Sequence, residues 1–252
     1  TPYFIISIPA IVIFVSVMER ETVWPEFYDN SILEQIVLFY LTGKHLAPLW
    51  FIPMIAIFYV IAPVLVKADR NKLIYYCLPL FIVLSCYVAR GLPHQSFVHF
   101  FSVYLLGMYC SKFKHAINPV ISKNWVILLG LSLILLLSYL EFFYMNGTMT
   151  YLNYLQKVTM SVFFLGLFIK YNERLDSKFI GGIAETSFGV FFIHSYVLTS
   201  GKLLYSKFAG QAASGNLLIY VLVSLLTLLV CAQMIFFVKR LLGSKSKLLV
   251  GS

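Results

Sequence analysis

Three side chains that could do acid–base or nucleophilic chemistry lie close together in the last third of the chain. They are Glu185, Ser187 and His194, and the imidazole stands inside the apolar run FGVFFIHSYVL (188–198). General bases and activated nucleophiles are built from such groups. In a regular helix, Glu185 and His194 would point to opposite faces roughly 13.5 Å apart along the axis, and Ser187 would be roughly 10.5 Å from His194. The sequence therefore predicts no direct pair among the three.

The composition indicates what surrounds these residues. The chain has 252 residues, of which 60% are hydrophobic and 12% charged, and its mean hydropathy is +0.87. Soluble domains contain about 25% charged residues, so this chain cannot cover a water-exposed surface of its size. We expect an integral membrane protein whose residues 1–252 form a single transmembrane domain.

Apolar segments long enough for membrane helices recur along the chain. A membrane-spanning helix needs about 20 mostly apolar residues, and we predict an all-α, polytopic helical bundle of about eight such spans. They fall near 3–18, 46–66, 73–89, 97–111, 124–144, 152–170, 179–199 and 216–238. The segment 32–43 is too short to span and carries Glu34 and Gln35, so we expect an interfacial or re-entrant helix there.

The basic residues predict the orientation. Most of the 19 Lys and Arg residues fall in one alternate set of connections: 67–72, 112–123, 170–178 and 239–252. Basic connections stay in the cytoplasm, so we expect both termini there and a multi-pass protein of the cell (inner) membrane. The net charge of +9 then needs no nucleic-acid partner, because the basic residues form short clusters and no continuous groove.

Ionisable groups at membrane depth usually face a bundle interior or a wet cavity, because each costs about 2.5–3.5 kcal/mol at the bilayer centre. His194, Arg90 and His45 all fall in the predicted outer half of the bundle. They could line one polar site, or they could be separate residues that never meet. No metal site is expected, because the sequence has no HExxH and its four cysteines have no ligand spacing.

Three stretches together resemble the acyltransferase 3 family of membrane-bound O- and N-acyltransferases. They are GKHLAPLWFIPMIAIFYVIAPVL (43–65), FVHFFSVYLLGMYCSKFK (97–114) and GGIAETSFGVFFIHSYVL (181–198). The resemblance covers roughly residues 40–240. It implies transfer of an acyl group, often acetyl, from acyl-CoA to a sugar of a cell-envelope polysaccharide or glycolipid.

The resemblance also implies the partners and the site. Acetyl-CoA or another acyl-CoA would be a co-substrate and no cofactor would be bound, while membrane lipid and a glycan acceptor would be the other partners. His194, Arg90 and His45 would position the acyl donor or acceptor, with Ser187 and Glu185 as further candidates.

One family feature is missing. The family has ten spans, and its first span carries an Arg followed about ten residues later by a His, whereas the segment 3–18 has neither residue. We expect that the chain corresponds to the last eight spans and that the leading catalytic His lies outside it. Two alternatives stay open: a transporter or flippase for a polysaccharide or lipid-linked precursor, and an inactive fragment that only binds a partner.

Overall fold

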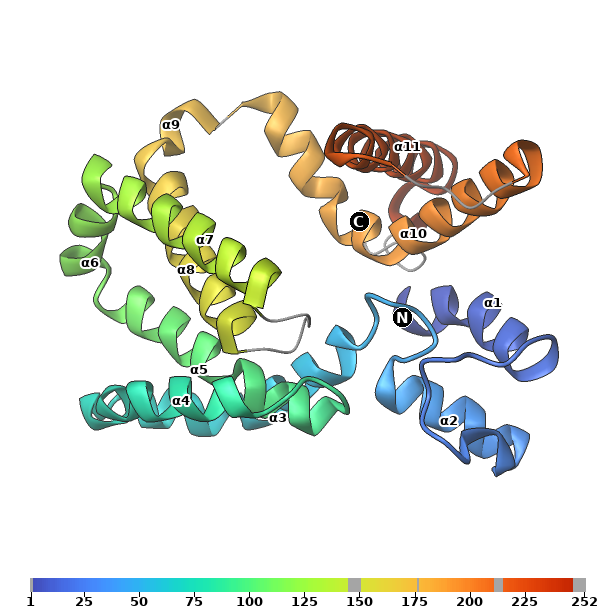
Figure 1. Ribbon diagram of the computed structural model, residues 1–252, viewed down its shortest axis with the longest axis horizontal. Coiled ribbons are helices and arrows are strands. Elements are labelled where there is room, and N and C mark those ends of the chain that lie inside the picture. Colours follow the sequence, from blue (N-terminus) through green and yellow to red (C-terminus); the bar gives the residue numbers. More distant parts are fainter. Residues whose placement is uncertain (1, 145–150, 176, 211–214, 247–252) are drawn as a thin grey trace. The chain divides into compact units, whose positions relative to one another are not determined.

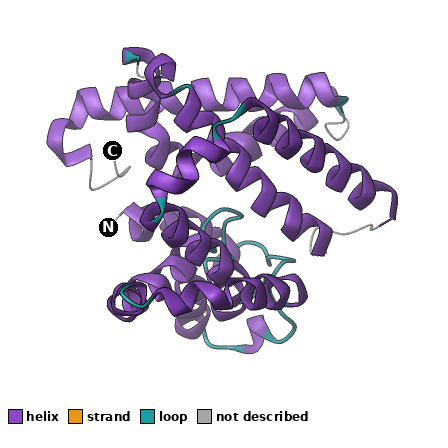
Figure 2. Cartoon of the chain, turned by 90° about the vertical axis from the view of Figure 1, so that its left-hand side faces the viewer, coloured by secondary structure: helices purple, strands orange, loops and turns teal. Residues whose placement is uncertain are grey.

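The computed structural model describes residues 2–144, 151–175, 177–210 and 215–246. All regular structure within these ranges is helical, as Figure 2 shows, and they contain no strand. The prediction of an all-α protein is therefore confirmed.

Four described helices are long and apolar enough to cross a membrane: α3 (Phe51–Asp69), α7 (Asn124–Tyr144), α8 (Tyr151–Lys170) and α11 (Leu217–Leu242). The prediction of about eight spans is not confirmed. Helix α1 (Pro2–Ser16) is apolar but short. The predicted third span is divided into the 3₁₀ segment Lys72–Cys77 and helix α4 (Leu78–Tyr87).

Two further helices are long but more polar. Helix α5 (Pro93–Lys112) carries two histidines, a glutamine and several serines, which dilute its hydropathy. Helix α10 (Lys178–Ala209) has 32 residues and extends well past the predicted end at 199. Both helices satisfy the length of a span but not its composition.

The chain divides into two compact units, Thr1–Pro53 with Ser177–Ser252, and Met54–Asp176. The prediction of one transmembrane domain stays a prediction. The first unit contains α1, α2 (Ile32–Thr42), α10 and α11, together with the short 3₁₀ segments Phe27–Asp29 and Gly243–Lys245. Within it, α1 packs on α2 and on α10, and α10 packs along α11.

Local sequence explains the ends of α2. Ser31 caps its first turn in a capping box, because the Ser31 hydroxyl accepts from the Glu34 backbone N–H and the Glu34 carboxylate accepts from the Ser31 N–H. Gly43 ends the helix with φ +68°, a left-handed conformation that glycine adopts without strain. A short helix at 32–43 was predicted, and its existence is confirmed.

The second unit contains most of α3, then α4, α5, α6 (Lys114–Ile121), α7, α8 and α9 (Asn172–Leu175). Helices α7 and α8 lie side by side, as Figure 1 shows, and α4 contacts both α5 and α8. A side chain at Gly166 of α8 would come within 2.4 Å of the Ile121 carbonyl oxygen. This small residue therefore permits the close approach of α6 and α8.

Candidate functional site

A buried imidazole–hydroxyl pair lies in the first unit, between α1 and the segment after α2. His45 follows the Gly43 turn, and its side chain and that of Ser7 on α1 are both fully buried. The Nε2 atom of His45 lies 2.7 Å from Ser7 Oγ, and Nδ1 lies 3.0 Å from the Phe39 carbonyl oxygen. Both ring nitrogens of His45 therefore have partners.

The partners determine the protonation of the ring. A carbonyl can only accept, so Nδ1 carries the hydrogen and donates to Phe39. The pKa of His45 is lowered to about 4, mainly by burial and to a smaller extent by the Arg20 charge, against the raising effect of the Phe39 hydrogen bond. The ring is thus neutral near pH 7, and its Nε2 lone pair accepts from the Ser7 hydroxyl.

Ser7 has a second acceptor. Its Oγ lies 2.6 Å from the Tyr3 carbonyl oxygen, one helical turn earlier on α1. The hydroxyl has one hydrogen, so it donates either to His45 or to Tyr3. When that hydrogen turns toward Tyr3, the Nε2 lone pair of His45 is unshared, while the ring itself stays fully buried.

Aromatic side chains surround the pair. The ring centroids of Tyr3, Phe39 and Tyr40 lie 6.1, 5.8 and 6.1 Å from that of His45. The Tyr3 hydroxyl donates to the Tyr40 carbonyl at 2.6 Å. These rings exclude water from the imidazole and bind α1 to α2.

The Arg20 side chain brings a positive charge close to this site. Its Nε donates to the Lys44 carbonyl at 2.7 Å, directly before His45 in the chain, and its guanidinium lies 4.9 Å from the Phe14 ring centroid. Its backbone N–H donates to the Tyr28 hydroxyl at 2.6 Å. Arg20 therefore holds the loop that presents His45.

The third stretch that carries the family resemblance packs on the same core. On α10, Phe192 is buried against Tyr3 and Leu49, and the Tyr196 hydroxyl donates to the Ile6 carbonyl at 2.6 Å. His194 is half-buried nearby on the same helix, where its Nδ1 bonds the Val190 carbonyl at 3.0 Å. The structure thus brings His194 and His45 into one unit without a described bond between them.

The two further candidates on α10 do not join this pair. Ser187 is exposed and donates to the Ala184 carbonyl at 2.7 Å. Glu185 is exposed too, and its backbone carbonyl accepts from the ammonium of Lys239 at 3.5 Å. Neither residue bonds His194 in the described part of the chain.

Arg90 belongs to the second unit, where a separate polar cluster joins α4, α5 and α8. Ser85 and Ser102 are 2.7 Å apart between hydroxyl oxygens, and Ser102 bonds the Tyr154 hydroxyl. His99 donates from Nδ1 to the Val88 carbonyl at 2.7 Å, and its ring packs on Tyr154 at 5.0 Å. Arg90 interacts electrostatically with His99 and with Lys157 of α8. The expected site of His194, Arg90 and His45 is therefore divided between the two units.

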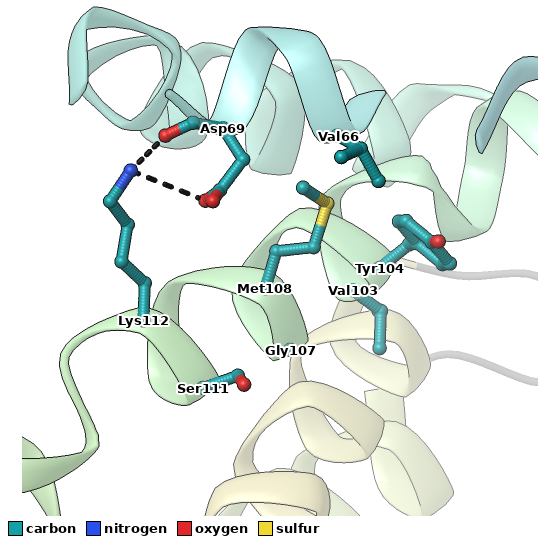
Figure 3. Close-up of a pocket in the computed structure, with 8 residues that line it drawn as sticks. All are labelled: Val66, Asp69, Val103, Tyr104, Gly107, Met108, Ser111 and Lys112. Carbon is teal, nitrogen blue, oxygen red and sulfur yellow. Dashed lines mark hydrogen bonds and ion pairs between the residues drawn. The ribbon is translucent and has the colours of Figure 1, made fainter. Parts of the chain in front are cut away.

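The second unit also has an open groove, shown in Figure 3. It lies between the ends of α3 and α5 and has a volume of about 510 Å³. Val66, Val103 and Met108 give it apolar walls, and Asp69 and Lys112 form an ion pair of 3.4 Å at one end. The groove can hold an elongated apolar group.

Comparison with known protein families agrees with the membrane protein that the long apolar helices indicate. The family model described as an acyltransferase domain, acyltransferase 3, matches residues 1–236. The chain therefore belongs to the acyltransferase 3 family and is a membrane acyltransferase of that general kind. No curated protein and no solved structure matches it significantly.

Sequence reasoning found His45 but not its partners. His45 stood out because an ionisable residue is rare in such an apolar chain. Ser7 gave no signal, because serine is common in membrane helices and its partner lies 38 positions away. Arg20 lies in the acidic stretch 19–31, and nothing in its spacing indicated that it would contact the backbone at Lys44.

Proposed function

We propose that this protein transfers an acyl group from acyl-CoA to a sugar hydroxyl of a cell-envelope polysaccharide or glycolipid. Acetyl is the acyl group that we propose first. The observation that carries the proposal is the family match over residues 1–236. The apolar helices support a reaction at a membrane, and the predicted inner membrane would give access to cytoplasmic acyl-CoA and to envelope glycans.

We further propose that His45 takes the proton of the attacking hydroxyl, once binding of the acceptor displaces the Ser7 hydroxyl from Nε2 and opens the aromatic side chains around the buried ring. As the acceptor oxygen bonds to the thioester carbonyl carbon, its proton moves to Nε2 of His45; the carbon–sulfur bond breaks, and the CoA thiolate takes the proton from the ring. The neutral ring, the Nδ1 bond to Phe39 and the alternative acceptor for the Ser7 hydroxyl support this role. Ser7 acts as a positioning residue, because it orients the ring without itself receiving the acyl group.

An assay of acyl transfer tests the proposed function. Membranes containing the protein expressed from its complete gene are incubated with radiolabelled acetyl-CoA, and the label in purified glycan is compared with that in membranes lacking the protein. We expect protein-dependent labelling that alkaline hydrolysis removes as acetate, as an ester requires. Movement of labelled glycan across vesicles without acyl-CoA, with no acylated product, would support the transporter alternative and contradict the proposal.

A further inference from the structure

The groove between α3 and α5 has the shape of a site for a hydrocarbon chain. The side chains of Val66, Val103 and Met108 line it along its length, and Tyr104 closes part of one wall. Gly107 contributes no side chain, and a Cβ atom built there would have no heavy atom within 4 Å. The groove thus extends over the α5 backbone at Gly107, and its walls offer few hydrogen-bonding groups.

One end of the groove is charged. The Lys112 ammonium contacts both the Asp69 carbonyl oxygen and the Asp69 carboxylate, and the Tyr75 hydroxyl also donates to that carboxylate. Lys112 additionally lies 5.6 Å from the Tyr75 ring centroid. Because Tyr75 would continue to satisfy Asp69, Lys112 can exchange its carboxylate partner for another anion.

Basic residues outnumber acidic ones around this end. Four further cations lie within five positions of Asp69 or Lys112 in the sequence: Lys67, Arg70, Lys72 and Lys114. Asp69 is the only acidic residue in the stretches 67–72 and 110–115. Asp69 and Lys112 are the charged residues that line the groove itself, and the four neighbouring cations make the sequence around this end basic. Basic pockets between membrane helices are typical sites for anionic lipid headgroups.

We propose that the groove binds one anionic phospholipid, with an acyl chain along Val66, Val103 and Met108 and the phosphate at Lys112. The apolar walls distinguish a hydrocarbon chain from the pantetheine arm of acyl-CoA. That arm has two amides, and burying an amide without partners is costly, whereas the groove offers only the Ser111 and Tyr104 hydroxyls as polar side chains between its ends. This lipid site is independent of the acyl-transfer reaction.

Native mass spectrometry of the detergent-purified full-length protein tests the site. The protein is incubated with phosphatidylglycerol or with phosphatidylcholine of the same chains, and the retained lipid is counted. We expect one phosphatidylglycerol molecule to be retained in preference to phosphatidylcholine. Gly107→Leu should lower its retention about tenfold, because the leucine fills the groove where the structure leaves open space.

Gly181→Leu on α10 is the matched control, because a Cβ atom at Gly181 also has no neighbour within 4 Å. It should retain lipid as the parent protein does, and circular dichroism should show that both variants are folded. Equal retention by Gly107→Leu and Gly181→Leu would overturn the proposal.

A second variant tests the charged end. Lys112→Gln should remove the preference for phosphatidylglycerol over phosphatidylcholine while leaving the groove open; an unchanged preference would contradict the assignment of the phosphate to Lys112. Displacement of the lipid by micromolar acetyl-CoA would identify the co-substrate as the occupant and overturn the lipid assignment. Since the readout is retained lipid, loss of the site and absence of acyl transfer are separate results.

Discussion

Ser7 Oγ and His45 Nε2 are 2.7 Å apart, although the residues are 38 positions apart in the sequence. This bond joins α1 to the loop after α2, inside a ring of aromatic side chains. It holds a neutral imidazole whose other nitrogen is occupied by the Phe39 carbonyl. The pair is thus a tertiary contact and a potential proton acceptor at the same time.

Ser7→Ala should destabilise the protein by about 1–3 kcal/mol, because it leaves Nε2 of His45 buried without a partner. Acyl transfer should fall as well, since the ring loses its orientation. Thermal melting in detergent and the glycan-labelling assay measure the two effects. Ser224→Ala is the control, because Ser224 is exposed and bonds only the carbonyl of its own helix. A melting temperature equal to that of Ser224→Ala would contradict this role of Ser7.

Stability should depend on pH through His45. Its folded pKa of about 4 lies below the ordinary value of 6.5, so the unfolded chain binds a proton more readily between these values. Stability should fall as the pH drops from about 6.5 to about 4, by about 3 kcal/mol from this residue, and the contribution should be complete above 6.5. Melting curves of the parent and of His45→Gln measure it. The variant should show a shallower slope in this window, and identical slopes would contradict the prediction.

Gly43→Ala should destabilise the loop that presents His45. The residue has φ +68°, and a Cβ atom would lie 2.3 Å from the Leu49 carbonyl oxygen. The strained backbone costs about 1–2 kcal/mol, and the displacement of Leu49 adds to this. Gly182→Ala on α10 meets no neighbour within 4 Å, so it should be neutral or slightly stabilising. Comparison of the two melting temperatures is the test, and equal values would exclude the tight turn.

His194→Ala should lower acyl transfer about tenfold or more without unfolding the protein. The described bond of this imidazole goes to the Val190 carbonyl of its own helix, which remains bonded in the helix without it. A loss of positioning would change transfer far more than stability. His115→Ala in α6, an exposed residue of the other unit, is the control for the labelling assay. If His194→Ala and His115→Ala transferred the acyl group equally well, His194 would contribute only to packing.

The helices could be predicted because their signal is local. Apolar runs predicted every long helix of the structure, and the Ser31–Glu34 spacing explains the start of α2. The number of spans was harder to predict, because a run such as 73–89 contains a 3₁₀ segment that shortens its α-helix to Leu78–Tyr87.

The site could be predicted only in part. His45 was identified by its residue type, but the partners Ser7 and Arg20 depend on how α1 and the loop after it fold back on residues 44 and 45. Contacts between residues so far apart in the chain produce no repeating pattern in the sequence. Whether Arg90 joins His45 and His194 stays a prediction, since it belongs to the other unit.

The most direct test of the central claim is the transfer of label from acetyl-CoA to glycan by the parent protein and by His45→Gln, each expressed from the complete gene at equal levels in membranes. The account predicts labelled ester in the parent membranes and a loss of about 10²-fold or more in the variant. Equal labelling by the folded variant would contradict the role of His45, and no labelling by the parent protein with any acyl-CoA and glycan fraction would contradict the proposed function itself.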